Sequence, residues 1–162
     1  MANNEITFPE KKFIVSKTDL QGKITYGNSL FISISGYDEE ELLGAPHNIL
    51  RHPEMPKLIY KYLWEYIRRG DEIFAYVKNK TKNGDYYWVY AHVTPSFNHS
   101  GQIIGYHSAR RKPTSKAMNV ILPLYQSLLN AERSGGVAAS EKLLATKLSQ
   151  TGQTYDEFIF AL

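Results

Sequence analysis

The chain has 162 residues, enough for one domain with a terminal extension, and its 43% hydrophobic and 22% charged residues are ordinary for a globular protein. The formal net charge of +3 is too small to indicate a nucleic-acid partner. The absence of cysteine excludes disulfides, thiolate nucleophiles, iron–sulfur clusters and cysteine-ligated zinc. No apolar run approaches the ~20 residues that span a bilayer, and residues 1–12 lack the apolar core of a signal peptide. We therefore expect a cytoplasmic protein without direct membrane insertion.

Apolar periodicity, capping residues and turn residues predict a series of short strands and helices. In chain order we expect a lead-in over 1–12, strands over 13–18 and 23–26, helices over 30–35, 39–43 and 57–69, strands over 72–80, 85–95 and 102–110, and helices over 116–133 and 137–150. A short last helix should begin near Thr154. Pro123 should kink its helix or start a fresh turn, and residues 134–136 should end that helix.

Several of these boundaries depend on residues with strong local preferences. Asn28 is placed to cap the first short helix, and Asp38 begins a capping-box pattern for the second. Apolar residues recur at helical spacing along one face of residues 57–69. The dipeptide Asn83-Gly84 favours a tight hairpin turn between two strands.

The order of the elements is two strands, a block of helices and then three strands. We predict an α+β fold in which a five-stranded antiparallel sheet carries helices on one face, with a C-terminal helical extension. The chain is then divided into an N-terminal lead-in over residues 1–12, a core domain over 13–112 and an extension over 113–162.

Side-chain alternation assigns the strand residues to the two faces of this sheet. After Gly84, small aliphatic residues share one face and larger residues share the other: Val89, Ala91 and Val93 against Trp88, Tyr90, His92 and Thr94. The aliphatic face suits a flat pocket that admits a ring system, whereas the aromatic face suits packing against another element. By the same count, Asn79 points into the pocket.

Residues 46–56 read PHNILRHPEMP and lie between two segments with helical signals. Three prolines in so short a span predict an ordered turn rather than a helix, because proline fixes φ and disfavours helix in the preceding residue. Such a turn can direct polar side chains, here two His and one Arg, into a cavity.

Together with GYDEEELLG (36–44), KTKNGDYYWV (80–89) and GQIIGYHSARRKP (101–113), this stretch resembles PAS domains of the aerotaxis-receptor type. The resemblance covers about residues 13–112 and implies a PAS fold that binds FAD non-covalently and reports its redox state. It further implies a sensor that passes its signal to a membrane chemoreceptor lacking its own PAS domain, with residues 113–162 as the output or dimerisation element. We also expect a homodimer, because an uncovered aromatic sheet face would leave a large apolar patch.

The resemblance also implies which residues hold the cofactor. The expected set is Arg51, His52, Asn28, His47, Asn79, His107 and Trp64. Arg51 and His52 occupy positions associated with FAD binding, and a guanidinium suits phosphate oxygens. Asn79 is expected to bond the pyrimidine edge of the flavin, while Trp64 or Phe74 is a candidate for ring stacking.

Two histidines correspond to positions of light-sensing PAS domains. His47 stands where those proteins carry a reactive cysteine, so a thiol–flavin bond is impossible in this chain. His107 aligns with a strand glutamine beside the flavin N5, where an imidazole would exchange a proton with the reduced ring.

Other functions remain open at this point. A PAS oxygen sensor that holds haem b through one axial histidine is one alternative, and a cofactor-free PAS dimerisation module is another. Catalysis is not expected, because the sequence contains no phosphate-binding glycine loop and no recognisable nucleophile–base arrangement.

Overall fold

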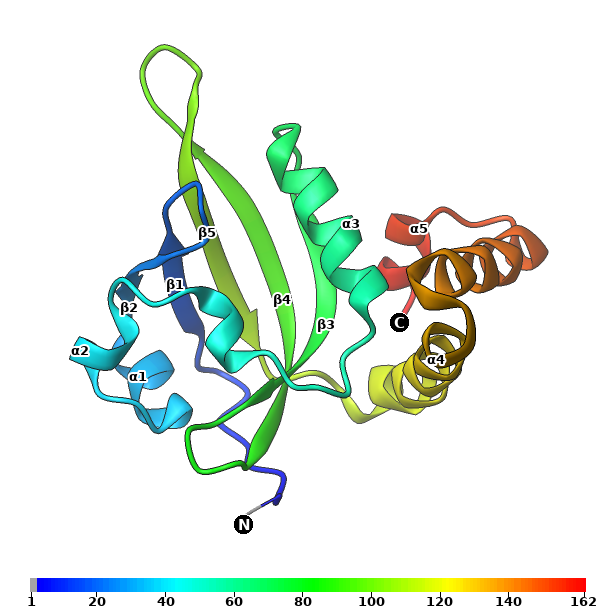
Figure 1. The fold of residues 1–162 in the computed structure, drawn as a ribbon, viewed down its shortest axis with the longest axis horizontal. Helices are drawn as coiled ribbons and strands as arrows, with labels where there is room; N and C mark the ends of the chain where they lie inside the picture. Colours follow the sequence, from blue (N-terminus) through cyan, green and yellow to red (C-terminus); the bar gives the residue numbers. More distant parts are fainter. Residues whose placement is uncertain (1–2) are drawn as a thin grey trace.

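Five strands form one antiparallel sheet in the order β2-β1-β5-β4-β3, in a computed structural model that describes residues 3–162 (Figure 1). The strands are β1 (Ile14–Thr18), β2 (Ile24–Gly27), β3 (Ile73–Lys80), β4 (Tyr86–Phe97) and β5 (Ile103–Arg111). The helices are α1 (Ser29–Ser35), α2 (Glu39–Leu42), the 3-10 helix η1 (His47–Leu50), α3 (Lys57–Arg68), α4 (Ser115–Thr151) and α5 (Tyr155–Phe160). The predicted α+β fold with a helical extension is confirmed.

The local signals act as their chemistry predicts. The Asn28 side chain accepts from the Phe31 amide and caps α1. Asp38 and Glu41 form the expected capping box of α2. Gly84 turns between β3 and β4 with a φ of 96°, a left-handed conformation that glycine adopts without a steric cost.

The proline-rich stretch contains one turn of 3-10 helix, η1, which the sequence interpretation did not include. After it, the Arg51 backbone forms an antiparallel bridge with Asn79 of β3. The stretch therefore runs beside the end of an edge strand before α3 starts at Lys57. This places the polar residues of the turn next to the inner face of the sheet.

The two faces of the sheet carry different side chains, as the alternation predicts. On the inner face, Val77, Val89 and Ala91 lie beneath α3 and are buried. On the outer face, Phe74 stacks on His92 with ring centroids 4.1 Å apart. In Figure 1, α1 and α2 lie beside β1 and β2, while α3 lies along β3 and β4.

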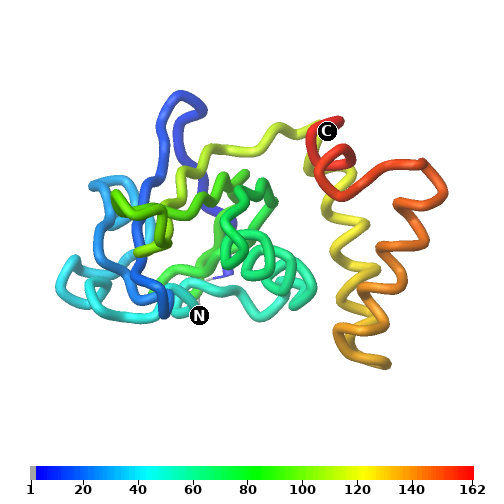
Figure 2. Tube along the Cα trace, turned by 90° about the horizontal axis from the view of Figure 1, so that it is seen from above, coloured from blue at the N-terminus to red at the C-terminus, as the bar shows by residue number. Residues whose placement is uncertain are grey.

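The extension forms a helical hairpin at one side of the sheet domain (Figure 2). Helix α4 is interrupted at Gly136 (φ 70°, ψ −166°), where the sequence predicted a break. Pro123 lies inside the first arm, and Gly136 rather than Pro123 carries the non-helical backbone angles. None of the helices formed by residues 3–162 is long and apolar enough to cross a membrane.

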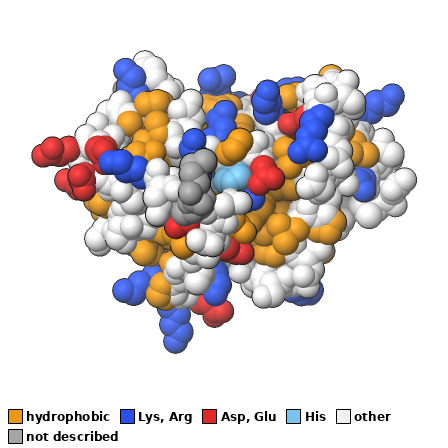
Figure 3. All heavy atoms as spheres, turned by 60° about the horizontal axis from the view of Figure 1, so that its bottom comes forward, with side chains coloured by type: hydrophobic (Ala, Val, Ile, Leu, Met, Phe, Trp, Pro, Cys, Tyr) orange, Lys and Arg blue, Asp and Glu red, His pale blue; other side chains and the backbone are white. Residues whose placement is uncertain are grey.

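The extension packs against its own subunit. Ile121 and Leu128 are fully buried, whereas Val120 is 40% exposed. Tyr125 contacts Trp88 on the outer face, with ring centroids 5.9 Å apart. Part of the aromatic face is thus covered within one chain, so it no longer argues for a dimer. The face in Figure 3 shows separate hydrophobic patches, with basic side chains scattered among them.

Candidate functional site

A cavity of about 200 Å³ lies between the inner face of the sheet and α3. Its walls are largely apolar: Leu63 and Ile67 from α3, and Val77, Ala91 and Val93 from the sheet. These sheet residues are small, so the floor of the cavity is flat and has room for a planar group. Trp64 and Tyr106 also line the cavity and meet edge to face, with ring centroids 5.6 Å apart.

One end of the cavity is polar and is built around Arg110. Its side chain comes from β5, which places Arg110 opposite Ala91 on the inner face, and the residue is 3% exposed. Nη2 donates to Ser16 Oγ and lies 3.2 Å from Nε2 of His47. Nη1 is buried and has no hydrogen-bond partner among residues 3–162.

A buried guanidinium normally has a carboxylate partner, because desolvation of an unpaired charge is costly. No ion pair among the described residues includes Arg110, and burial lowers the pKa of its guanidinium to about 10. The positive charge and the free Nη1 group together favour a ligand that brings hydrogen-bond acceptors or negative charge.

His47 completes this polar end in its neutral form. Burial and the nearby charge of Arg110 lower the pKa of the imidazole from 6.5 to about 3. Because a guanidinium only donates, Nε2 of His47 is the acceptor in this contact and the proton is on Nδ1. The ring lies 5.9 Å from that of Phe31, which fixes the imidazole between helix and strand.

A second unsatisfied group lies close by. The Tyr87 hydroxyl is buried and has no partner within residues 3–162, and burial raises its pKa to about 12. Tyr87 pairs in register with Asn79, which lines the cavity and is 5% exposed. Buried polar atoms are rarely left without partners, so the unpartnered Nη1 of Arg110, which lines the cavity, points to a ligand that supplies an acceptor.

Arg51 stands where the cavity opens to the surface. Its guanidinium lies 3.8 Å from the centroid of the Tyr60 ring. A second, more open hollow shares Arg51, Tyr60 and Trp64 with the cavity and adds Lys61, Glu65 and Arg68 from α3. Three cationic side chains therefore border this outer hollow.

The structure brings together five of the seven expected residues: Arg51, His47, Asn79, Trp64 and His107 all belong to the cavity lining. His52 and Asn28 lie outside that lining. His52 Nδ1 accepts from the Glu54 amide at 3.0 Å, and Glu54 pairs with Lys78. Asn28 caps α1 and bonds the Val15 amide at 3.1 Å. Both side chains accept hydrogen bonds from backbone amides and do not line the cavity.

The sheet register places the side chain of His107 on the outer face. His107 pairs with Thr94 and Lys17, whose side chains lie on the outer face. The inner face of β5 carries Tyr106 and Arg110 instead. By alternation, the His107 imidazole lies on the outer face, and the residue borders the cavity through its backbone.

Sequence reasoning missed Arg110 as a cavity residue, because it belongs to a basic cluster at a strand end. The available signal was its spacing from Tyr106, which alternation places on the same face. No group of three or more potential ligands among residues 3–162 is arranged to hold a metal ion.

Comparison with known proteins adds independent information. A family model described as "PAS fold" matches residues 24–110. The aerotaxis receptor of Escherichia coli (strain K12) is 43% identical over 121 residues, 75% of this chain and 24% of that protein. The nitrogen fixation regulatory protein of Klebsiella pneumoniae is 28% identical over 97 residues, 60% of this chain and 20% of that protein.

The fold is also found among solved structures. One reported as "Flavin Analogue Sheds Light on Light-Oxygen-Voltage Domain Mechanism" aligns with a TM-score of 0.61 and 21% identity. The alignment covers 70% of this chain and 87% of that one. The chain thus matches most of a single solved domain but no more than a quarter of either curated relative.

Proposed function

Because this chain belongs to the PAS fold family, we propose that its cavity binds FAD non-covalently and that the protein is a redox sensor of the aerotaxis type. The observation that carries the proposal is the buried Arg110 guanidinium, unpaired within residues 3–162, at one end of a flat aliphatic cavity. A flavin ring matches both features, since it is planar and has acceptor atoms along one edge.

The residues present fit a flavin. Arg110 and Asn79, both in the cavity lining, offer donors, and the small aliphatic residues of β3 and β4 leave room for the ring. When bound, the flavin supplies reversible electron transfer. The guanidinium favours added negative charge on a reduced ring, because opposite charges attract strongly where water is excluded.

The cationic outer hollow, rather than the size of the cavity, supports FAD over a smaller flavin. The cavity of about 200 Å³ is below the usual range for whole drug-sized ligands, roughly 300–1,000 Å³, so a dinucleotide would be only partly enclosed. The outer hollow continues from Arg51, and its other cations are Lys61 and Arg68. We assign this hollow to the diphosphate and adenosine half, because guanidinium groups bind phosphate oxygens in a forked geometry.

The sensor assignment extends what the relatives indicate. The E. coli relative is named an aerotaxis receptor, and this chain matches about a quarter of it. We propose that this chain passes the flavin redox state to a membrane chemoreceptor. Co-purification with tagged chemoreceptor signalling domains, at oxidising and reducing potentials, measures the relay directly.

The test of the binding proposal is a fluorescence titration of ligand-free protein with FAD, FMN and riboflavin. We expect all three to bind, with FAD tightest, and we expect Arg51→Met to remove the preference for FAD. Binding of haem with a Soret band, and of no flavin, would replace the proposal with the haem alternative. Failure to bind either ligand would leave a cofactor-free module.

A further inference from the structure

Helix α3 takes its N-terminal cap from the extension. Pro56 precedes the helix and has no side-chain acceptor for the first amide groups. The Glu132 carboxylate of α4 accepts from the Lys57 amide through Oε1 at 2.9 Å and from the Leu58 amide through Oε2 at 3.1 Å. The carboxylate also complements the positive end of the helix dipole.

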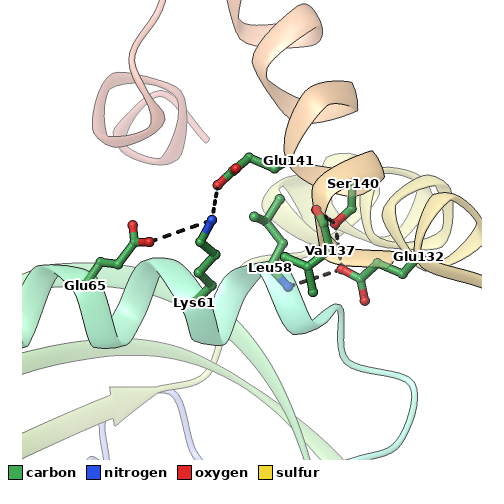
Figure 4. Close-up of polar contacts among 7 residues, drawn as sticks. All are labelled: Leu58, Lys61, Glu65, Glu132, Val137, Ser140 and Glu141. Atoms are coloured by element: carbon green, nitrogen blue, oxygen red, sulfur yellow. Dashed lines mark hydrogen bonds and ion pairs between the residues drawn. The ribbon is translucent and has the colours of Figure 1, made fainter. Parts of the chain in front are cut away.

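The second arm of the extension holds Glu132 in place. The fully buried Ser140 donates its hydroxyl to Oε2 of Glu132 at 2.8 Å (Figure 4). Ser140 lies beyond the break at Gly136, so this supporting bond forms only when the two arms of α4 are folded together. The neighbouring contact between Lys61 and Glu141, at 2.8 Å, is partly exposed.

The extension is also bonded to β3, the edge strand of the sheet. The Tyr125 hydroxyl donates to the Tyr76 carbonyl at 2.6 Å, and the Tyr155 hydroxyl donates to the Phe74 carbonyl at 2.8 Å. Edge-strand carbonyls have no neighbouring strand, and the tyrosines supply the donors that they lack. The extension thus bonds α3 and β3, the two elements that enclose the cavity.

We propose that Glu132 is a positioning residue that couples the helical extension to the cavity. Ligand binding that seats α3 against β3 strengthens the Glu132 cap, and by reciprocity loss of the cap weakens ligand binding. The coupling deepens the proposed function and takes FAD as its ligand from it. The extension then responds to the state of the cavity through hydrogen bonds to the backbone of both walls.

The experiment compares Glu132→Gln with Glu141→Gln in the full chain. The control removes an equal charge and a contact with α3, but from the side chain of Lys61 rather than from the helix terminus. Hydrogen exchange of the Lys57 and Leu58 amides reports the cap, and exchange at the Arg51–Asn79 bridge reports the cavity wall. FAD affinity and the flavin midpoint potential report the coupling.

For Glu132→Gln we expect exchange about 10-fold faster at both places and FAD affinity about 5-fold lower, with the control close to wild type. Faster exchange at α3 with unchanged exchange at the bridge, unchanged affinity and an unchanged potential would overturn the coupling while FAD binding stands. If wild type takes up no FAD, the proposed function fails, and exchange at the bridge in ligand-free protein still decides the coupling.

Discussion

The inner and outer faces of the sheet are completed in different ways. On the outer face, aromatic rings of β3 and β4 stack on one another, and the hydroxyls of Tyr125 and Tyr155 bond backbone carbonyls. On the inner face, small residues surround a cavity, and the buried Nη1 of Arg110 and hydroxyl of Tyr87 lack partners within residues 3–162. The chain's own side chains cover most of the outer face, where the buried Nε2 of His92 also lacks a hydrogen-bond partner within residues 3–162 but lies 3.4 Å from Glu72. The inner face instead keeps a cavity beside its unpartnered donors.

This difference gives opposite expectations for stability and binding. Removing a group that completes the outer face should destabilise the protein. Removing an orphan group from the inner face should cost little stability and much affinity, because an unpaired buried charge opposes folding of the ligand-free protein.

The largest effect is expected at Arg110. Arg110→Met should lower FAD affinity about 100-fold, which corresponds to about 3 kcal/mol for charge-assisted hydrogen bonds. Ligand-free Arg110→Met should melt at the same temperature as wild type or higher, since Ser16 and His47 can bond each other across 3.2 Å. Titration and thermal unfolding measure the two quantities. Arg111→Met, on the outer face, is the matched control; equal losses of affinity in both variants would count against the cavity.

Acid should destabilise the ligand-free protein through His47. The pKa of its imidazole falls from 6.5 to about 3 on folding, so the unfolded state binds more protons between these values. Stability from His47 is full above pH 6.5 and is lost as pH falls, by about 3 kcal/mol down to about pH 4. Urea unfolding at several pH values should give a shallower decline for His47→Asn. If the free energy of unfolding falls equally with pH in the variant and in wild type, His47 is not the group whose lowered pKa causes the loss of stability.

A larger side chain in the cavity should lower FAD affinity without lowering the stability of the protein. Ala91→Leu adds methyl groups to an open space, so we expect FAD affinity to fall about 30-fold or more while the melting temperature holds or rises. Ala109→Leu places the same side chain on the outer face, opposite His92, and should bind FAD normally. Isothermal titration distinguishes the two variants, and normal binding by Ala91→Leu would show that the ligand lies elsewhere.

The outer face should respond to loss of its hydroxyls. Tyr125→Phe with Tyr155→Phe leaves two edge-strand carbonyls without donors, at a cost of about 2 kcal/mol in the free energy of unfolding. Denaturant unfolding measures this loss. The exposed Tyr26→Phe serves as the control, and a double variant as stable as the control would show that the extension does not need these bonds.

The smallest effect is expected at His107. Its side chain lies on the outer face, so His107→Ala should change FAD affinity by less than about 2-fold. A large loss of FAD affinity in the same titration would indicate that the imidazole lies in the cavity, and it would contradict the sheet register.

Local chemistry explains what the sequence could predict. Caps at Asn28 and Asp38, the Asn83-Gly84 turn and the break near Gly136 depend on neighbouring residues, and the structure contains all of them. Strand alternation also placed Ala91, Val93 and Asn79 on the inner face correctly.

Long-range geometry explains what was missed. His107 was assigned by resemblance, and one position along a strand reverses the face. Arg110 has the same residue type as its exposed neighbour Arg111, and only the fold distinguishes them. The cap from Glu132 to Lys57 joins residues 75 positions apart, and no local pattern marks such a contact.

The most direct test of the cavity assignment is an anaerobic absorption spectrum of the purified protein, reconstituted with FAD, before and after dithionite. We predict flavin bands in the blue that bleach on reduction and return with air, with the bound ligand recovered as FAD after denaturation. A protein that shows no such bands after reconstitution, while folded and with its cavity accessible, would contradict the claim that the orphan Arg110 is completed by a flavin.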